Sequence, residues 1–217
     1  MHKAELRHAF HVLCVLAAPA VFAGPLEIRL VGVDGRGVGG TVITLRHVDA
    51  SRPLAAPVQA TLEQVNLSFK PDVLVVPAGS KITFPNTDKV SHQVYSFSPT
   101  KRFQLPLYRG TPYPPMEFEK RGVVTLGCNI HDQMRAYVYV VEAQYYGRMD
   151  KQGLWKVPDV VPGEYTVQVW HPLARDSAPL LETRITVTAA TPTLALRLAT
   201  EPRLRADSRI PANWDAY

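Results

Sequence analysis

Three side chains with soft or nitrogen donor atoms lie within residues 126–134, and this cluster restricts the fold more than any other feature. Cys128, His131 and Met134 stand three residues apart, so one tight loop offers a thiolate, an imidazole and a thioether to a single point. Val124, Leu126 and Cys128 follow a two-residue period, which places them on one face of a strand. The Cys128 sulfur is therefore expected to enter a core from the end of that strand.

A fourth donor has to come from another strand, because a hairpin loop alone cannot surround a metal ion. His92 is the candidate, since it follows an apolar strand and a polar turn and opens a second strand. It shares a face with Val94 and Ser96. Two imidazoles and a thiolate in a trigonal plane, with a long axial thioether, form the electron-transfer site of blue-copper proteins. The predicted copper ligands are His92, Cys128, His131 and Met134.

Other metals and other ligands fit this pattern less well. Zinc prefers four strong ligands, and its structural sites show paired cysteines or histidines at short spacing. A soft axial sulfur instead suits copper in both oxidation states. Asp132, beside His131, is expected to shape the loop or face solvent, and Met116 is too distant from the motif to replace Met134. Asn86 and Asp88 are expected to fix the backbone before His92.

Residues 60–142 resemble a cupredoxin domain of the plastocyanin and amicyanin kind. The resemblance rests on residues 69–88, on His92 and on the sequence Gly-Cys-Asn-Ile-His-Asp-Gln-Met at 127–134. The loop spacing is similar to that of amicyanins, which serve methylamine utilisation, and is shorter than that of plastocyanins. One position departs from the pattern, because Gln93 follows the first ligand where these families usually carry Asn.

The resemblance implies a Greek-key β-sandwich and a copper cofactor that cycles between Cu²⁺ and Cu⁺. It implies a carrier of single electrons and not an enzyme, with a c-type cytochrome or a periplasmic dehydrogenase as its redox partner. By the same resemblance His131, ringed by residues such as Ile130 and Pro106, is the electron port. Two alternatives remain open: a copper-containing sensor or enzyme with an open site, and a β-sandwich binding module with a vestigial metal site.

The first residues have the order of a secretory signal peptide. Residues 1–11 carry basic side chains, residues 12–23 are mostly apolar, and small residues precede Gly24, so cleavage is expected near Ala23 and Gly24. Cleavage removes Cys14 and leaves Cys128 as the lone thiol in an oxidising compartment, where a bound metal would protect it. The sequence thus predicts a periplasmic or secreted protein, with no membrane span after cleavage.

Composition indicates an all-β chain. Nineteen prolines, thirteen glycines and many Val, Thr and Tyr residues favour strands and turns. The formal net charge is +5, but the basic residues are scattered, which argues against nucleic acid as a partner.

The expected organisation has five parts: a signal peptide (1–23), N-terminal strands (24–48), a cupredoxin domain (60–142), a second small β-sandwich (143–200) and a tail (201–217). Residues 143–200 and the N-terminal strands resemble a carboxypeptidase regulatory-like β-sandwich, into which the cupredoxin domain would be inserted. A single strand-swapped assembly is the alternative. Within this scheme, residues 64–69 are predicted as one strand and residues 105–118 as a proline-rich surface loop. His47 and His171 are expected at the surface.

Overall fold

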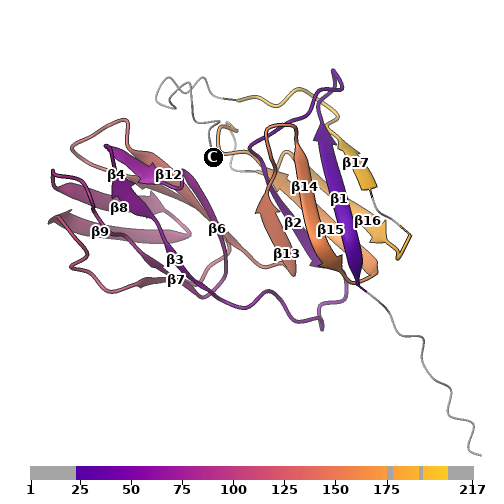
Figure 1. The fold of residues 1–217 in the computed structure, drawn as a ribbon, viewed down its shortest axis with the longest axis horizontal. Coiled ribbons are helices and arrows are strands. Elements are labelled where there is room, and N and C mark those ends of the chain that lie inside the picture. Colours follow the sequence, from indigo (N-terminus) through magenta and orange to yellow (C-terminus); the bar gives the residue numbers. More distant parts are fainter. Residues whose placement is uncertain (1–22, 175–177, 191–192, 205–217) are drawn as a thin grey trace, which may run out of the picture.

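The chain folds into β-strands throughout its described part. The structure is a computed structural model, and it describes residues 23–174, 178–190 and 193–204. All the regular secondary structure in those ranges is β-strand, which confirms the prediction of an all-β fold (Figure 1). Among the same residues, no helix has the length and hydropathy needed to span a membrane. The predicted signal peptide lies almost wholly outside the described residues, as does the tail beyond residue 204.

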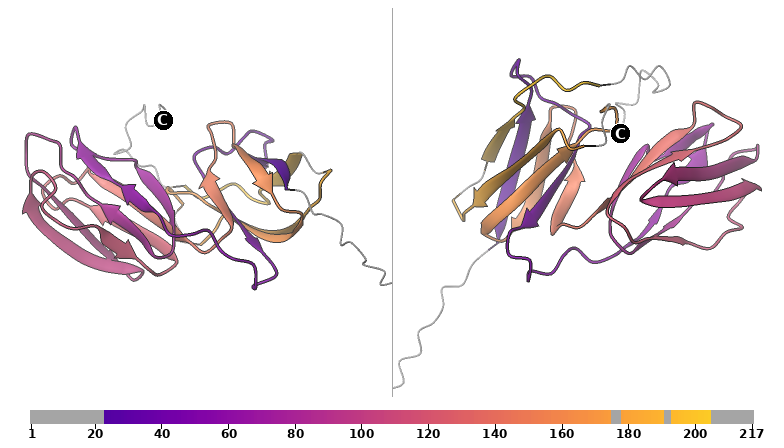
Figure 2. Two further views of the ribbon diagram at one scale, coloured as in Figure 1. Left: turned by 60° about the horizontal axis from the view of Figure 1, so that its bottom comes forward. Right: turned by 180° about the vertical axis from the view of Figure 1, so that it is seen from behind.

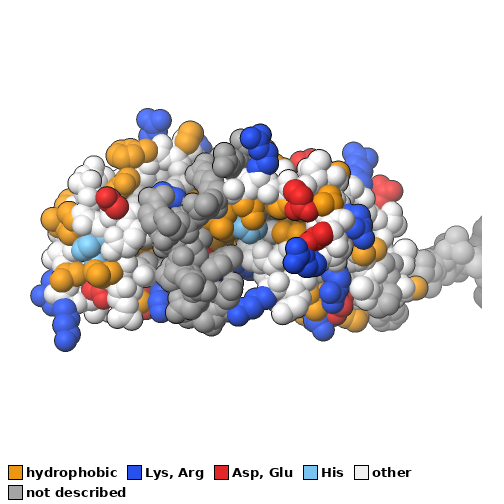
Figure 3. Space-filling model, turned by 90° about the horizontal axis from the view of Figure 1, so that it is seen from above, with side chains coloured by type: hydrophobic (Ala, Val, Ile, Leu, Met, Phe, Trp, Pro, Cys, Tyr) orange, Lys and Arg blue, Asp and Glu red, His pale blue; other side chains and the backbone are white. Residues whose placement is uncertain are grey.

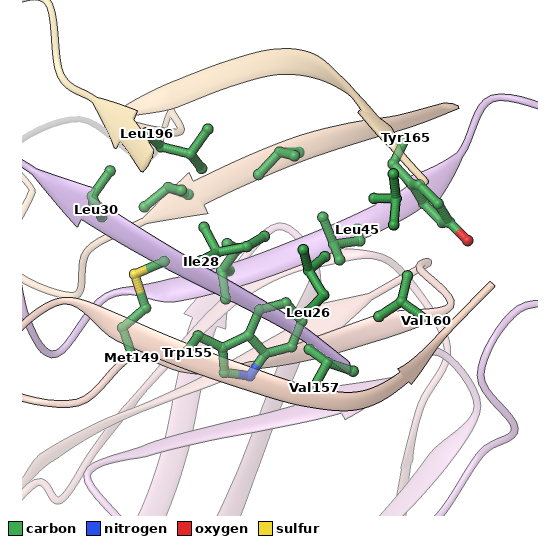
Figure 4. Close-up of a cluster of buried hydrophobic side chains, with 14 of the residues drawn as sticks. Leu26, Ile28, Leu30, Leu45, Met149, Trp155, Val157, Val160, Tyr165 and Leu196 are labelled. Atoms are coloured by element: carbon green, nitrogen blue, oxygen red, sulfur yellow. The ribbon is translucent and has the colours of Figure 1, made fainter. Parts of the chain in front are cut away.

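One β-sandwich, here called the terminal sandwich, combines strands from both ends of the described chain. Its two sheets have the orders β14-β1-β17 and β13-β2-β15-β16. The strands are β1 (Gly24–Val31), β2 (Val42–His47), β13 (Tyr145–Arg148), β14 (Leu154–Val160), β15 (Gly163–Trp170), β16 (Leu181–Val187) and β17 (Thr193–Arg197). Leu26, Ile28 and Leu30 alternate along β1 and meet Trp155 and Tyr165 between the sheets (Figure 4). Burial of each such side chain contributes roughly 1.5–3 kcal/mol.

The second β-sandwich, here called the central sandwich, is formed by the middle of the chain. A three-stranded sheet, β10-β7-β3, faces a five-stranded sheet, β6-β12-β11-β8-β9, and β4 and β5 form a separate hairpin. Its strands are β3 (Gln59–Thr61), β4 (Glu63–Val65), β5 (Ser68–Lys70), β6 (Val73–Pro77), β7 (Ser80–Thr83), β8 (His92–Ser98), β9 (Lys101–Tyr108), β10 (Met116–Phe118), β11 (Gly122–Gly127) and β12 (Arg135–Val141). Because β8 begins at His92 and residues 128–134 join β11 to β12, the predicted ligands lie at strand ends.

Two local predictions were wrong. Residues 64–69 are not one strand, because Asn66 and Leu67 adopt positive φ angles of 54° and 56° and turn the chain into the β4–β5 hairpin. Residues 105–118 are not a continuous loop either. Their first part belongs to β9, an edge strand, where proline is tolerated, and Met116 opens β10.

The two sandwiches lie side by side and share an apolar contact (Figure 2). Trp170 of β15 packs its ring against Tyr137 and Tyr139 of β12, with centroid separations of 5.6 and 5.1 Å. A bidentate ion pair joins Arg148 to Asp72, with N···O distances of 2.7 and 3.1 Å. The terminal sandwich thereby covers part of the outer face of the five-stranded sheet.

His171 is buried, in contrast to the expected surface position. Its side chain is 4% exposed, and Nδ1 accepts a hydrogen bond from the Leu173 backbone N–H at 3.0 Å. Burial, helped by the nearby positive charge of Arg148, lowers the pKa of His171 to about 4. The folded protein therefore holds a neutral imidazole at neutral pH.

We expect His171 to make the fold sensitive to acid. Its folded pKa lies below the unfolded value of about 6.5, so the stabilisation is complete above pH 6.5 and is lost as pH falls toward 4. The free energy of unfolding should fall by about 2 kcal/mol more in wild type than in His171→Asn between pH 7 and pH 4.5. Urea denaturation at both pH values measures the difference. The asparagine side chain can still accept the Leu173 N–H, so equal pH dependence in the two proteins would contradict the assignment.

Candidate metal centre

The structure brings three of the four predicted ligands together. Nδ1 of His92 lies 3.1 Å from Nδ1 of His131, and the Cys128 sulfur lies 3.9 Å from the first nitrogen and 3.6 Å from the second. All three donor atoms lie within 4.8 Å of one another. Among the described residues, these three side chains form the cluster of His, Cys and acidic residues that could hold a metal ion. His92 is fully buried and Cys128 is 3% exposed, whereas His131 reaches the surface in part.

The dimensions of this triangle fit a metal ion. A point in its plane that is equidistant from the three donors lies about 2.1 Å from each, close to the 2.0–2.3 Å of bonds from imidazole nitrogen or thiolate to a first-row metal. Two imidazoles and a thiolate are also the trigonal donor set that copper takes in electron-transfer sites.

Met134 belongs to the same apolar core cluster as Cys128. The side chain is 2% exposed, and both residues line one hollow in the surface. The Met134 backbone N–H donates to the His131 carbonyl at 2.9 Å, and this turn returns the chain to the core after His131. The Met134 side chain thus lies in the same part of the core as Cys128, while Met116 packs on the core from β10 and Asp132 faces solvent.

The Asp88 carboxylate sets the orientation of the His92 ring, which is a role that the sequence did not predict for it. Asp88 was expected to fix the backbone before His92, but its Oδ2 lies 2.7 Å from Nε2 of the His92 ring. With the proton on Nε2 and donated to Asp88, the lone pair of Nδ1 points toward Cys128 and His131. The carboxylate also accepts the backbone N–H groups of Asn66 and Leu67 at 2.6 and 2.9 Å.

Asp88 remains an anion in this position. Burial acts to raise its pKa, but hydrogen bonds from the Leu67 N–H, the His92 ring and the Asn66 N–H outweigh it, and the pKa is lowered. Asn86 supports the same loop as expected, because its Nδ2 donates to the carbonyls of Val90 and Tyr108 at 3.0 and 2.7 Å. His92 is therefore held by its own ring contact and by a fixed loop.

We expect loss of Asp88 to weaken metal binding more than loss of a neighbouring surface charge. Removing an outer carboxylate that orients a ligating histidine typically lowers metal affinity by about 10- to 100-fold. Asp88→Ala should lower copper affinity to that extent, whereas Asp132→Ala removes the same charge from the ligand loop and should change it by less than about threefold. Competition with a chromophoric chelator measures both constants, and equal affinities in the two variants would exclude a special role for Asp88.

Comparison with known proteins gives partial matches. Residues 119–194 match a family model described as polysaccharide lyase family 4, domain II. A search of curated proteins finds no match.

Several solved structures are similar to part of the chain. A Cu-containing nitrite reductase from Thermus scotoductus SA-01 is 24% identical, with a TM-score of 0.37, over 45% of this chain and 25% of that one, so this chain spans about a quarter of the enzyme's length. A purple cupredoxin from Nitrosopumilus maritimus is 23% identical, with a TM-score of 0.33, over 38% of this chain and 99% of that one. A reduced amicyanin variant is 19% identical, with a TM-score of 0.35, over 46% and 98%.

The class of this protein is defined by its own fold and site. The chain is an all-β protein of two sandwiches, and one sandwich carries two imidazoles and a thiolate at the ends of its strands.

Proposed function

We propose that this protein is an exported type 1 (blue) copper protein that carries single electrons between redox partners. The observation that carries the proposal is the triangle of His92, Cys128 and His131, whose dimensions suit one metal ion. Bound copper would supply a one-electron couple to this site. The cupredoxin resemblance of residues 60–142 supports the proposal, and Met134 is the proposed fourth, axial ligand.

The surrounding residues have the properties that such a carrier needs. Asp88 holds the His92 ring, and the neighbouring core side chains Val94, Leu126 and Ala136 are fully buried, so water has little access to the inner side of the site. Ligands that are held in fixed positions move little when the metal changes its oxidation state, so the reorganisation energy of electron transfer stays small. The thioether of Met134 and the dryness of the core would tune the reduction potential.

His131 is the proposed port for electrons. It is the partly exposed ligand, and its neighbour Ile130 is 51% exposed. Val90 and Leu107 are exposed in the segments that flank His92 and its pairing partner Tyr108. Figure 3, which views the molecule from above, shows hydrophobic side chains among the polar ones on the left-hand sandwich. A small apolar surface around a ligand favours brief contact with a second redox protein, for which we propose a c-type cytochrome or a periplasmic dehydrogenase.

The remaining parts of the sequence scheme belong to the same proposal. We propose export through a signal peptide at residues 1–23, a cupredoxin domain at 60–142, and a regulatory-like sandwich formed by residues 24–48 and 143–200. The pairing of β1 with β14 and β17 supports the last of these, since it joins the two segments in one sheet. Residues 201–217 are the proposed tail.

Copper loading of the mature protein tests the function. We expect one copper per chain, an intense visible absorption band, and reversible one-electron reduction without loss of metal. Electron exchange with a c-type cytochrome should follow in stopped-flow mixing. A protein that takes up no copper would indicate a vestigial site, and a copper form that binds azide would indicate an open site and an enzyme or sensor.

A further inference from the structure

A polar cleft, here called the junction cleft, opens beside the apolar contact between the two sandwiches. Val42 of β2 belongs to that contact, whereas Thr44 and Arg46, which follow on the same face of the strand, line the cleft. Strands β2, β15 and β16 of the terminal sandwich form one wall, and β12 of the central sandwich forms the other. The cleft has a volume of about 210 Å³. Concave spaces between domains are frequent sites for small ligands.

Two hydroxyl groups of the junction cleft have no hydrogen-bond partner among the described residues. They belong to Thr44 and Tyr139, which are 6% and 8% exposed and lie on opposite walls. Within the described chain, the fully buried side-chain oxygen or nitrogen that lacks a partner belongs to Gln64, so the two hydroxyls keep access to the space in the cleft. A nearly buried polar group without a partner favours a ligand that supplies the missing hydrogen bond.

The charged side chains of the junction cleft are already held by other groups. Arg121 donates to Oε1 of Gln168 at 2.7 Å, and Nε2 of the same amide donates to Glu182 at 2.7 Å. Arg46 and Glu142 form an ion pair at 3.6 Å between the two walls. The lining therefore contains two guanidinium groups and two carboxylates, whose formal charges cancel. This balance favours an uncharged ligand over an anion or a cation.

The lining can both donate and accept hydrogen bonds around an apolar floor. Burial raises the pKa of Tyr139, while the charges of Arg121 and Glu182 act on it in opposite directions, so the phenol keeps its proton at neutral pH. Its hydroxyl, like that of Thr44, donates one hydrogen bond and accepts others. Val141 and the ring of Tyr139, which packs against Trp170, form the apolar part. A sugar ring matches this lining, because it combines apolar C–H faces with uncharged hydroxyl groups that donate and accept.

We propose that the junction cleft binds one neutral sugar unit. The open hydroxyls of Thr44 and Tyr139 bond to hydroxyl groups of the ring, and Val141 contacts its C–H face. The charged pairs provide further donors and acceptors. A free sugar and the end unit of a polysaccharide offer the same hydroxyl chemistry. Binding needs no metal, so it is independent of the proposed function.

Sugar binding is tested on the metal-free full chain with ¹⁵N label. The probes are D-glucose and D-galactose, with D-glucuronate and D-glucosamine as their charged counterparts. We expect saturable amide shift changes centred on Thr44, Tyr139 and Gln168 with a neutral sugar, and at least threefold weaker binding of both charged probes. Cellotetraose that binds tighter than glucose would identify a chain end, and weaker binding would identify a free sugar. No saturable change with either neutral sugar, or tighter binding of a charged probe, would overturn the proposal.

Two variants test the open hydroxyls without changing the shape of the cleft. Thr44→Val and Tyr139→Phe should each weaken binding by about 2- to 10-fold. Tyr137→Phe is the matched control, because Tyr137 lies on the same strand and packs against Trp170 but does not line the cleft, and its affinity should equal that of wild type. Without sugar all three variants should melt as wild type does. Saturating sugar should raise the melting temperature of wild type more than that of Thr44→Val/Tyr139→Phe. Wild-type affinity in both hydroxyl variants would overturn the proposal.

Discussion

Replacing Cys128 by serine will abolish the intense visible absorption of the copper-loaded protein. That absorption arises from charge transfer between a thiolate and copper, and a serine hydroxyl provides neither the soft sulfur nor the negative charge. Copper affinity should fall by more than about 100-fold, since loss of an outer-shell partner alone costs 10- to 100-fold. Visible and spin-resonance spectra of the two loaded proteins, together with chelator competition, measure both effects.

The serine variant should remain folded, so a loss of visible absorption would report on the metal site and not on unfolding. Cys128 is the free, buried cysteine of the described residues and serine is nearly the same size. Far-ultraviolet circular dichroism and the melting temperature of the metal-free proteins provide the folding control. Met116→Leu is the matched substitution at a sulfur-containing residue of the same core, and its loaded form should keep the colour. A coloured serine variant would remove Cys128 from the site and the electron-carrier function with it.

Replacing Trp170 by alanine will destabilise the protein by about 3–5 kcal/mol, because truncation of a buried tryptophan removes its buried area and leaves a cavity. Trp170 is almost fully buried against Tyr137 and Tyr139. It is the buried aromatic side chain that the terminal sandwich contributes to the contact with the central one, where Tyr146 packs beside it as a partly buried residue. Urea denaturation of the metal-free protein, followed by tryptophan fluorescence and by circular dichroism, measures the loss.

The alanine variant should also separate the unfolding of the two sandwiches. Without the ring, the Arg148–Asp72 pair remains as a partly exposed ion pair, and such pairs contribute roughly 0–1 kcal/mol. The two probes should then report different midpoints. Trp170→Phe keeps an aromatic ring in the contact and should cost less than half as much as alanine. A single transition with a loss below about 1 kcal/mol would show that the apolar contact does not join the sandwiches.

The loop at residues 126–134 could be predicted from the sequence because the pattern that marks it lies within one short segment. Cys128, His131 and Met134 share one short segment, and the two-residue period of β11 fixes the direction of the cysteine. His92 was found through its place at the start of β8. All-β architecture followed from composition and from alternation along strands such as β1 and β15.

The contact between Asp88 and the His92 ring could not be predicted, because it depends on a hairpin that the sequence pattern concealed. The Asn66–Leu67 turn supplies the two N–H groups that hold Asp88 in place, and residues 64–69 had been predicted as one strand. His171 was misplaced for a similar reason. Its burial comes from the packing of the terminal sandwich, while its Trp-His-Pro context has no pattern that distinguishes a buried turn from an exposed one.

The pairing of β1 with β14 and β17 has a consequence for biosynthesis. A ribosome releases β1 and β2 first, yet their sheet partners emerge only after the whole central sandwich has left the exit tunnel. Throughout that interval the edges of two hydrophobic strands are unpaired. Unpaired strand edges are the places where nascent chains associate wrongly with one another. A chaperone or an export factor that keeps the nascent polypeptide extended until Leu196 has been added would suppress this off-pathway association.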